Sequence, residues 1–156
     1  MSLLKRIVDS YMQKVSGLKE HCNRCLKTER WRGSAVLMVV DAAFTSIGLN
    51  YFIAVVPKVE EFRKKFVETG KIKSLKELSK ANLDELRNVW RNKRSWIIAK
   101  EIASYLSTLS EDDKTSLRVW AKGANLEDWK EDPIGRIKGV GLITFQYLRM
   151  MEVSIR

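Results

Sequence analysis

The pattern of apolar and polar positions along the chain is that of helices from one end to the other. Residues 3–15 repeat apolar side chains at intervals of three and four, which gives one apolar stripe and one polar face. Residues 35–47 are almost uniformly apolar, so we expect a central helix that is mostly buried. Residues 49–66 resume a helical period, within which Pro57 acts as a cap or a kink.

The first of these segments carries Lys5, Arg6, Asp9 and Lys14 on its polar face. We expect its apolar stripe to pack against the rest of the domain, as amphipathic surface helices usually do. The alternative is a helix that binds a partner or a second copy of the chain. A membrane-surface role is less favoured, because the polar face includes an acid among its bases.

Shorter helical segments follow, each preceded by a residue that favours a helix N-terminus. Ser74 stands three residues before a glutamate, and Ser110 precedes three consecutive acids. Another helix begins at Asn82 or Ala81, and residues 93–106 form a longer one. No stretch alternates apolar and polar residues in the manner of a strand. The sequence therefore predicts an all-α fold of about eight helices joined by short loops.

Composition and charge narrow the range of functions. The chain has 156 residues, about one domain's worth, and 45% of them are hydrophobic. Its 29 Lys and Arg outnumber its 19 Asp and Glu, and the net charge of +10 favours a polyanionic partner, either nucleic acid or an acidic membrane surface. The apolar runs are too short for a membrane span, and the first residues do not resemble a secretory signal. We expect a cytoplasmic, nucleoid-associated protein.

The cysteines stand as a pair, Cys22 and Cys25, next to the single histidine, His21. These three side chains fall one short of the four ligands that a closed zinc site needs. A thioredoxin-like site would need a neighbouring strand–helix–strand pattern, and none is present. We expect structural thiols, with metal or redox chemistry as the alternative, and we expect no cofactor.

The most informative stretch runs from residue 132 to residue 148. Ile134 and Ile137 precede the tripeptide Gly139-Val140-Gly141, and an apolar helix follows. Two glycines around a buried valine form a tight turn whose backbone N–H groups point outward, with a helix N-terminus behind them. Because glycine has no Cβ, a nucleic-acid backbone can approach closely, so the turn predicts a phosphate site.

This stretch resembles the helix-hairpin-helix motif of the DNA glycosylase superfamily. That motif reads leucine, two residues, leucine-proline-Gly-Val-Gly, two residues, threonine-alanine. Matching residues are Ile134, Ile137, Gly139, Val140, Gly141 and Thr144, while Lys138 and Phe145 replace the proline and the alanine. Upstream, the helical segments 35–45, 75–90 and 93–106 follow in the family's order, so the similarity covers residues 31–151.

The resemblance implies a division of the chain and a DNA-binding surface. Residues 1–30 form an amphipathic helix and a basic connector, residues 31–151 the glycosylase-like helical barrel domain, with the helix-hairpin-helix at 134–151, and residues 152–156 a tail. The expected DNA-binding residues are Lys93, Arg94, Arg136, Lys138, Gly139, Val140, Gly141 and Thr144. Arg91, Lys71, Lys73 and Lys76 lie near them in sequence and would extend a phosphate-tracking face toward double-stranded DNA.

Catalysis is harder to place, and the catalytic residues are unknown. Bifunctional members of the family carry a nucleophilic lysine where this chain has Ile143. The aspartate that all members use would fall beyond Arg156, and Glu152 is a weak substitute. A side chain that fills the gap left by a flipped base would have to be Phe44 or Thr45. We therefore expect a DNA-binding protein similar to a monofunctional N-glycosylase, with little or no base excision.

The alternative function belongs to another class of protein. An apolar first helix, or an apolar face left uncovered on the helical domain, would make the chain a protein-interaction or oligomerisation module without a nucleic-acid role.

Overall fold

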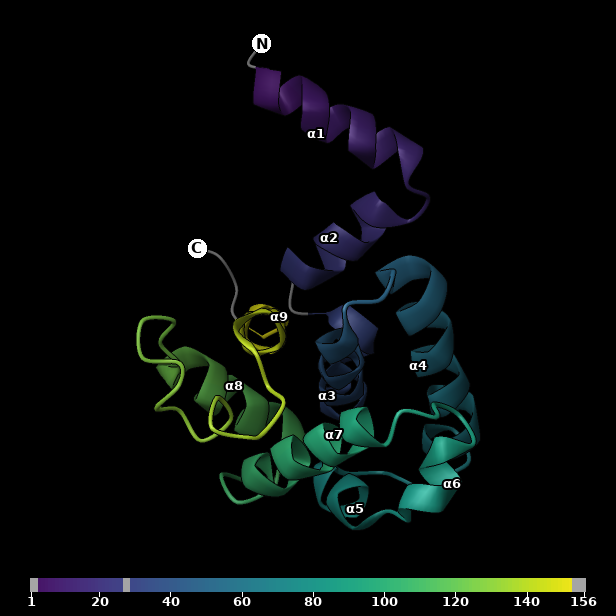
Figure 1. The fold of residues 1–156 in the computed structure, drawn as a ribbon, viewed down its shortest axis with the longest axis vertical. Helices are drawn as coiled ribbons and strands as arrows, with labels where there is room; N and C mark the ends of the chain where they lie inside the picture. Colours follow the sequence, from purple (N-terminus) through teal and green to yellow (C-terminus); the bar gives the residue numbers. More distant parts are fainter. Residues whose placement is uncertain (1–2, 27–28, 153–156) are drawn as a thin grey trace.

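The structure, a computed structural model, describes residues 3–26 and 29–152, and every regular element in these ranges is helical (Figure 1). The α-helices are α1 (Leu3–Lys14), α2 (Leu18–Leu26), α3 (Ala35–Phe44), α4 (Val56–Phe62), α5 (Leu75–Lys80), α6 (Leu83–Arg87), α7 (Lys93–Leu106), α8 (Asp113–Gly123) and α9 (Leu142–Met150). The prediction of an all-α fold is confirmed. The described ranges hold nine α-helices rather than about eight, because α2 lies in the segment that the sequence suggested was a connector. Each of these helices is too short or too polar to cross a bilayer.

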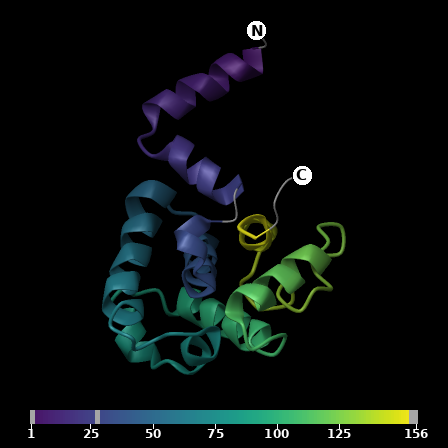
Figure 2. The ribbon, with the colours of Figure 1, turned by 180° about the vertical axis from the view of Figure 1, so that it is seen from behind.

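Helix α3 is the centre of the domain. All ten of its residues are buried, and it contacts α4, α7, α8 and α9, which surround it in both views of the ribbon (Figures 1 and 2). Ser34 caps it, with its Oγ accepting a hydrogen bond from the Leu37 amide at 3.3 Å. The prediction of a central, mostly buried helix is confirmed.

An aromatic stack joins the end of α3 to α7 and to the segment before it. Phe44 lies parallel to Trp90 with ring centroids 4.4 Å apart, and edge-on to Trp96 at 4.9 Å. The Trp96 indole N–H donates to the Trp90 carbonyl at 2.8 Å, which fixes both rings. Trp31 and Trp120 are also buried, so most of the tryptophans belong to the core.

The helix starts of the middle segment follow the local sequence closely. Ser74 caps α5 and Asn82 caps α6, as predicted, through their side-chain oxygens. The acids predicted at the start of α8 are there: Asp113 lies in its first turn, and Asp112 caps it by accepting from the Thr115 amide at 2.8 Å. These carboxylates oppose the positive end of the helix. Pro57 lies in the first turn of α4, where its missing N–H has no helical partner to lose.

The N-terminal helix stands away from the domain. In Figure 1 α1 projects beyond the body, and α2 connects it to the start of α3 through residues outside the described ranges. Helix α1 buries none of its residues. The amphipathic helix is therefore present, but the expectation that its apolar stripe packs against the rest of the domain is wrong. An amphipathic pattern indicates which face is apolar and not what covers it.

Replacing Phe44 tests the aromatic stack. Phe44→Ala should lower the free energy of unfolding by about 3–5 kcal/mol, because it removes a fully buried ring and leaves a cavity between two indoles. Urea titration followed by circular dichroism measures the change. Val119→Ala on the exposed surface of α8 is the control and should change stability by less than about 0.5 kcal/mol. Equal effects of the two substitutions would contradict this account of the core.

Candidate nucleic-acid interface

The first arm of the predicted hairpin is a single turn and not a helix. The Arg136 amide donates to the Asp132 carbonyl at 2.9 Å, and no α-helix is assigned between α8 and α9 in the described chain. The expected helix at the start of residues 134–151 is therefore wrong. The Asp132 carboxylate accepts from the Ile134 amide at 2.8 Å and from the Trp120 indole at 2.9 Å, so it ties this turn to α8.

The turn itself forms as the glycines suggested. Gly139 has a φ of +100°, and the following Val140 amide donates to the Ile137 carbonyl at 3.0 Å. A Cβ atom built on Gly139 would lie 2.9 Å from Cδ1 of Ile98 and 3.0 Å from Nε of Arg94. Glycine is thus required twice, for the left-handed backbone and for the close approach to α7. The same approach places Arg94 directly beside the turn.

Helix α9 starts without a side-chain cap. Its N-cap residue, Gly141, offers no side-chain oxygen to the first amides, and a Cβ there would meet no atom within 4 Å. Side chains cap five other helices: Ser34 on α3, Ser74 on α5, Asn82 on α6, Asn92 on α7 and Asp112 on α8. The first amides of α9 therefore have no side-chain cap at the positive end of the helix dipole, which is the arrangement that suits an anion.

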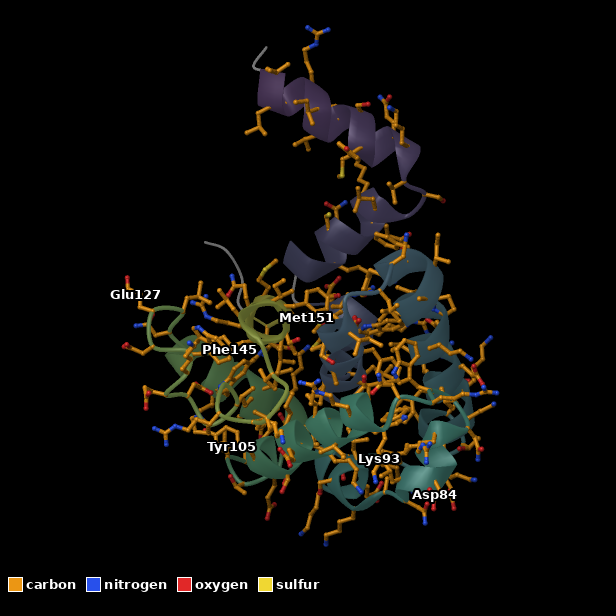
Figure 3. All side chains as sticks on the ribbon, viewed as in Figure 1. Asp84, Lys93, Tyr105, Glu127, Phe145 and Met151 are labelled. Atoms are coloured by element: carbon orange, nitrogen blue, oxygen red, sulfur yellow. The ribbon has the colours of Figure 1, made fainter. Side chains whose placement is uncertain are left out.

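Lys93 and Arg94 stand at the start of α7, where Arg94 lies against Gly139, and Lys138 directly precedes that glycine. Lys93, Arg94 and Lys138 are exposed, and they make no ion pair with any residue that the structure describes. Figure 3 shows Lys93 at the start of α7. Arg136 differs, since its Nη2 lies 2.5 Å from Oε2 of Glu131, which neutralises part of its charge. The unpaired charges that favour an anion near the turn are therefore those of Lys93, Arg94 and Lys138.

Two of the predicted DNA-binding residues point inward. Val140 is 8% exposed and Thr144 is 3% exposed, so their side chains pack in the core and only their backbone can face a ligand. Ile143 is 79% exposed. Phe145 (Figure 3) lies on α9 and packs edge-on against Trp120 of α8, with ring centroids 5.3 Å apart. This ring therefore fills the contact between α8 and α9.

The residues suggested for contact with a flipped base or for catalysis are already engaged elsewhere. Phe44 is fully buried in the aromatic stack, so the proposal that it enters a DNA duplex is wrong. The Thr45 hydroxyl donates to the Ala42 carbonyl at 2.6 Å. Glu152 accepts from Nε of Arg118 at 3.0 Å, and burial raises the pKa of its carboxyl.

The cysteine pair supplies no metal site in the described part of the chain. Cys22 is a half-buried free thiol, and no group of three or more His, Cys, Asp and Glu side chains lies close enough to hold an ion within that part. The side chains of His21 and Cys25 lie outside the described residues.

The sequence did not predict a buried polar cluster around Asp41, which is fully buried in α3. Its Oδ2 accepts from the Trp31 indole at 2.6 Å, the Tyr51 hydroxyl at 2.8 Å and the Tyr147 hydroxyl at 3.1 Å. Nη2 of Arg30 lies 3.6 Å from the same oxygen and also bonds the Tyr51 hydroxyl. A lone carboxylate within an apolar helix was the one signal that pointed to such a cluster.

Burial dominates the electrostatics of the cluster. Desolvation raises the pKa of Asp41 above its ordinary value of 3.8, although the Trp31 hydrogen bond and the Arg30 charge act in the opposite direction. Desolvation and then the charge of Asp41 raise the pKa values of Tyr51 and Tyr147 well above 10, so both phenols stay protonated and donate. Tyr147 belongs to α9, and the cluster therefore fastens the helix behind the glycine turn to α3.

Comparisons with family models, with curated proteins and with solved structures found no match to this chain. The similarity to the helix-hairpin-helix superfamily therefore remains a prediction that rests on the residues quoted for it.

The raised pKa of Asp41 predicts a pH dependence of stability. Below 3.8 both the folded and the unfolded chain hold the proton, and as the pH rises the folded chain must give it up from a buried site. The contribution of Asp41 to the free energy of unfolding therefore falls with rising pH. The stability of Asp41→Asn relative to the wild type should rise from about pH 4 to about pH 7, measured by urea titration.

Asp128→Asn is the control for this pH series, because Asp128 is exposed in the loop after α8. Its stability difference from the wild type should stay flat. A flat difference for Asp41→Asn as well would contradict the raised pKa.

Proposed function

We propose that this chain binds the sugar–phosphate backbone of double-stranded DNA through the turn Gly139–Gly141 and the start of α9. The observation that carries the proposal is the uncapped N-terminus of α9, which lies open beside Arg94. The first-turn amides of α9, at Leu142 and Ile143, would donate to phosphate oxygens. Lys93 and Lys138 would add sequence-independent attraction.

Contacts of this kind position a protein on the duplex and carry little sequence information. The proposed activity is therefore binding with weak sequence preference and strong salt dependence, with each neutralised phosphate adding about 0.9 to the slope of log affinity against log salt concentration. The resemblance to monofunctional DNA N-glycosylases supports the same partner and a helical barrel fold. Schiff-base lyase chemistry is not part of the proposal, because Ile143 has no amine to form the intermediate.

A single substitution separates binding from folding. Gly141→Asp places a carboxylate at the N-cap of α9, where aspartate stabilises a helix and where the backbone is extended and the space open. The same carboxylate occupies the first-turn amides and repels phosphate. Affinity for a fluorescein-labelled duplex, measured by anisotropy, should fall at least about tenfold while the thermal midpoint is kept or raised.

Asn125→Asp is the matched control, since it makes the same change of charge in the exposed loop after α8. It should change duplex affinity by less than about twofold. The proposal fails if wild-type protein shows no salt-dependent binding, or if Gly141→Asp binds as the control does.

Self-association through α1 is a second candidate function, favoured by the exposed apolar face of that helix. The face is formed by Leu3, Leu4, Ile7, Val8 and Tyr11, each of them exposed although large and apolar. A contiguous apolar face on a projecting helix is the kind of surface that a second copy of the chain would cover. This candidate does not exclude DNA binding by the domain.

Sedimentation velocity over a wide range of protein concentrations tests the second candidate. The wild-type sedimentation coefficient should increase with concentration, and Ile7→Glu should abolish the increase by placing a charge in the apolar face. Gln13→Glu makes the same charge change on the opposite face of α1 and should leave association unchanged. A wild-type protein that stays monomeric at all concentrations would exclude this role.

A further inference from the structure

The residues before α3 form a strained left-handed turn. Trp31 and Arg32 have φ values of +53° and +55°, and Gly33 follows at +76°. Only the glycine adopts this region without penalty, whereas the other two residues are strained there. The Trp31 indole is held by Asp41 at 2.6 Å, and Arg30 is held by the same cluster. The buried carboxylate thus keeps the backbone in a conformation that the local sequence alone would not choose.

The strained turn forms one wall of a cavity of about 340 Å³ that is separate from the glycine turn at residues 139–141. Arg24, Glu29, Arg32, Gly33 and Lys114 line this cavity. They come from α2, the strained turn with the residue before it, and the start of α8. A Cβ atom built on Gly33 would lie 2.8 Å from Nζ of Lys114, so the missing side chain lets the ammonium group lie against the turn.

The charges around this cavity are not balanced. Arg24 is paired with Glu20 across one turn of α2. The side chains of Arg32 and Lys114 make no hydrogen bond or ion pair with the residues that the structure describes. Among the lining residues, Glu29 is the one carboxylate beside Arg24, Arg32 and Lys114, while Asp112 and Glu152, outside the lining, also interact electrostatically with Lys114. An open cavity whose lining carries more cations than carboxylates attracts an anion.

We infer that this cavity is a second phosphate site, in which Arg32 and Lys114 bind the anion. A guanidinium group donates in a planar fork that matches two oxygens of one phosphate, and an ammonium group adds a compact charge. The strain fits this role, because backbone outliers persist where the surrounding structure holds a side chain in a working position. The phosphate is either a phosphodiester of DNA or the phosphate of a small molecule.

This inference depends on its own contacts and not on the glycine turn, so each proposal can fail without the other. It predicts opposite effects from two changes at one cavity. Arg32→Ala with Lys114→Ala removes the binding groups, whereas Glu29→Gln removes the carboxylate that competes with the ligand. The first variant should weaken phosphate binding and the second should strengthen it.

Two measurements on the full chain test the site and assign its source of phosphate. In the first, ¹⁵N-labelled protein is titrated with inorganic phosphate, and the amide signals of Arg32 and Gly33 should shift and saturate. The double alanine variant should lose these shifts, and Glu29→Gln should reach saturation at a severalfold lower phosphate concentration. In the second, duplex binding by the double variant should fall about tenfold, with the salt slope lowered by about 0.9, if the phosphate belongs to DNA.

Lys64→Ala with Lys122→Ala is the matched control, because it removes the same charge from exposed positions outside the cavity. The site is assigned to a small phosphorylated molecule if phosphate shifts the amide signals but the double alanine variant binds the duplex as the control does. The inference is overturned if phosphate does not move the Arg32 and Gly33 signals and Glu29→Gln does not tighten binding. The Glu29 variant keeps this test decisive even if the double alanine variant does not fold.

Discussion

The structure depends on one buried carboxylate. Asp41 has no exposed surface, and a single oxygen of it accepts hydrogen bonds from residues on three other segments of the chain. An unpaired charge in that position would be strongly destabilising, so the carboxylate requires each of its partners to be in place. It thereby sets where Trp31, Tyr51 and Tyr147 lie relative to α3. The apolar packing of the domain supplies the larger part of the stability, but this cluster determines the placement of three segments.

The sequence predicts well those features that depend on interactions between residues close together in the chain. The uniform apolarity of residues 35–47 gave the buried α3, and Ser74 and Asn82 gave two helix starts, since a cap needs only the amides two or three residues on. The turn at Gly139 was predicted for the same reason. We expected Arg94 to bind DNA together with that turn. Close packing of the turn against α7 is what brings the two together.

Interactions between distant residues explain most of what the sequence did not predict. The partners of Asp41 stand at positions 31, 51 and 147, and no periodicity connects them. The resemblance suggested Phe44 for contact with a flipped base because of its place at the end of the apolar helix, whereas its neighbours in the fold are Trp90 and Trp96. The first arm of the hairpin is a turn that Asp132 connects to an indole of α8, a contact between residues 12 positions apart.

The hydrogen bonds of Asp41 have a thermodynamic consequence for the two anion sites. One oxygen bonds both Trp31, which stands in the strained turn, and Tyr147, which stands on the helix behind the glycine turn. A ligand bound at either proposed site would change the free energy of binding at the other site if it changed the hydrogen bonds to this oxygen. Such coupling is reciprocal: if the first ligand changes the affinity for the second by some factor, the second changes the affinity for the first by the same factor. If both proposed sites bind their ligands, a single carboxylate oxygen is the physical point through which occupancy of one would affect the other.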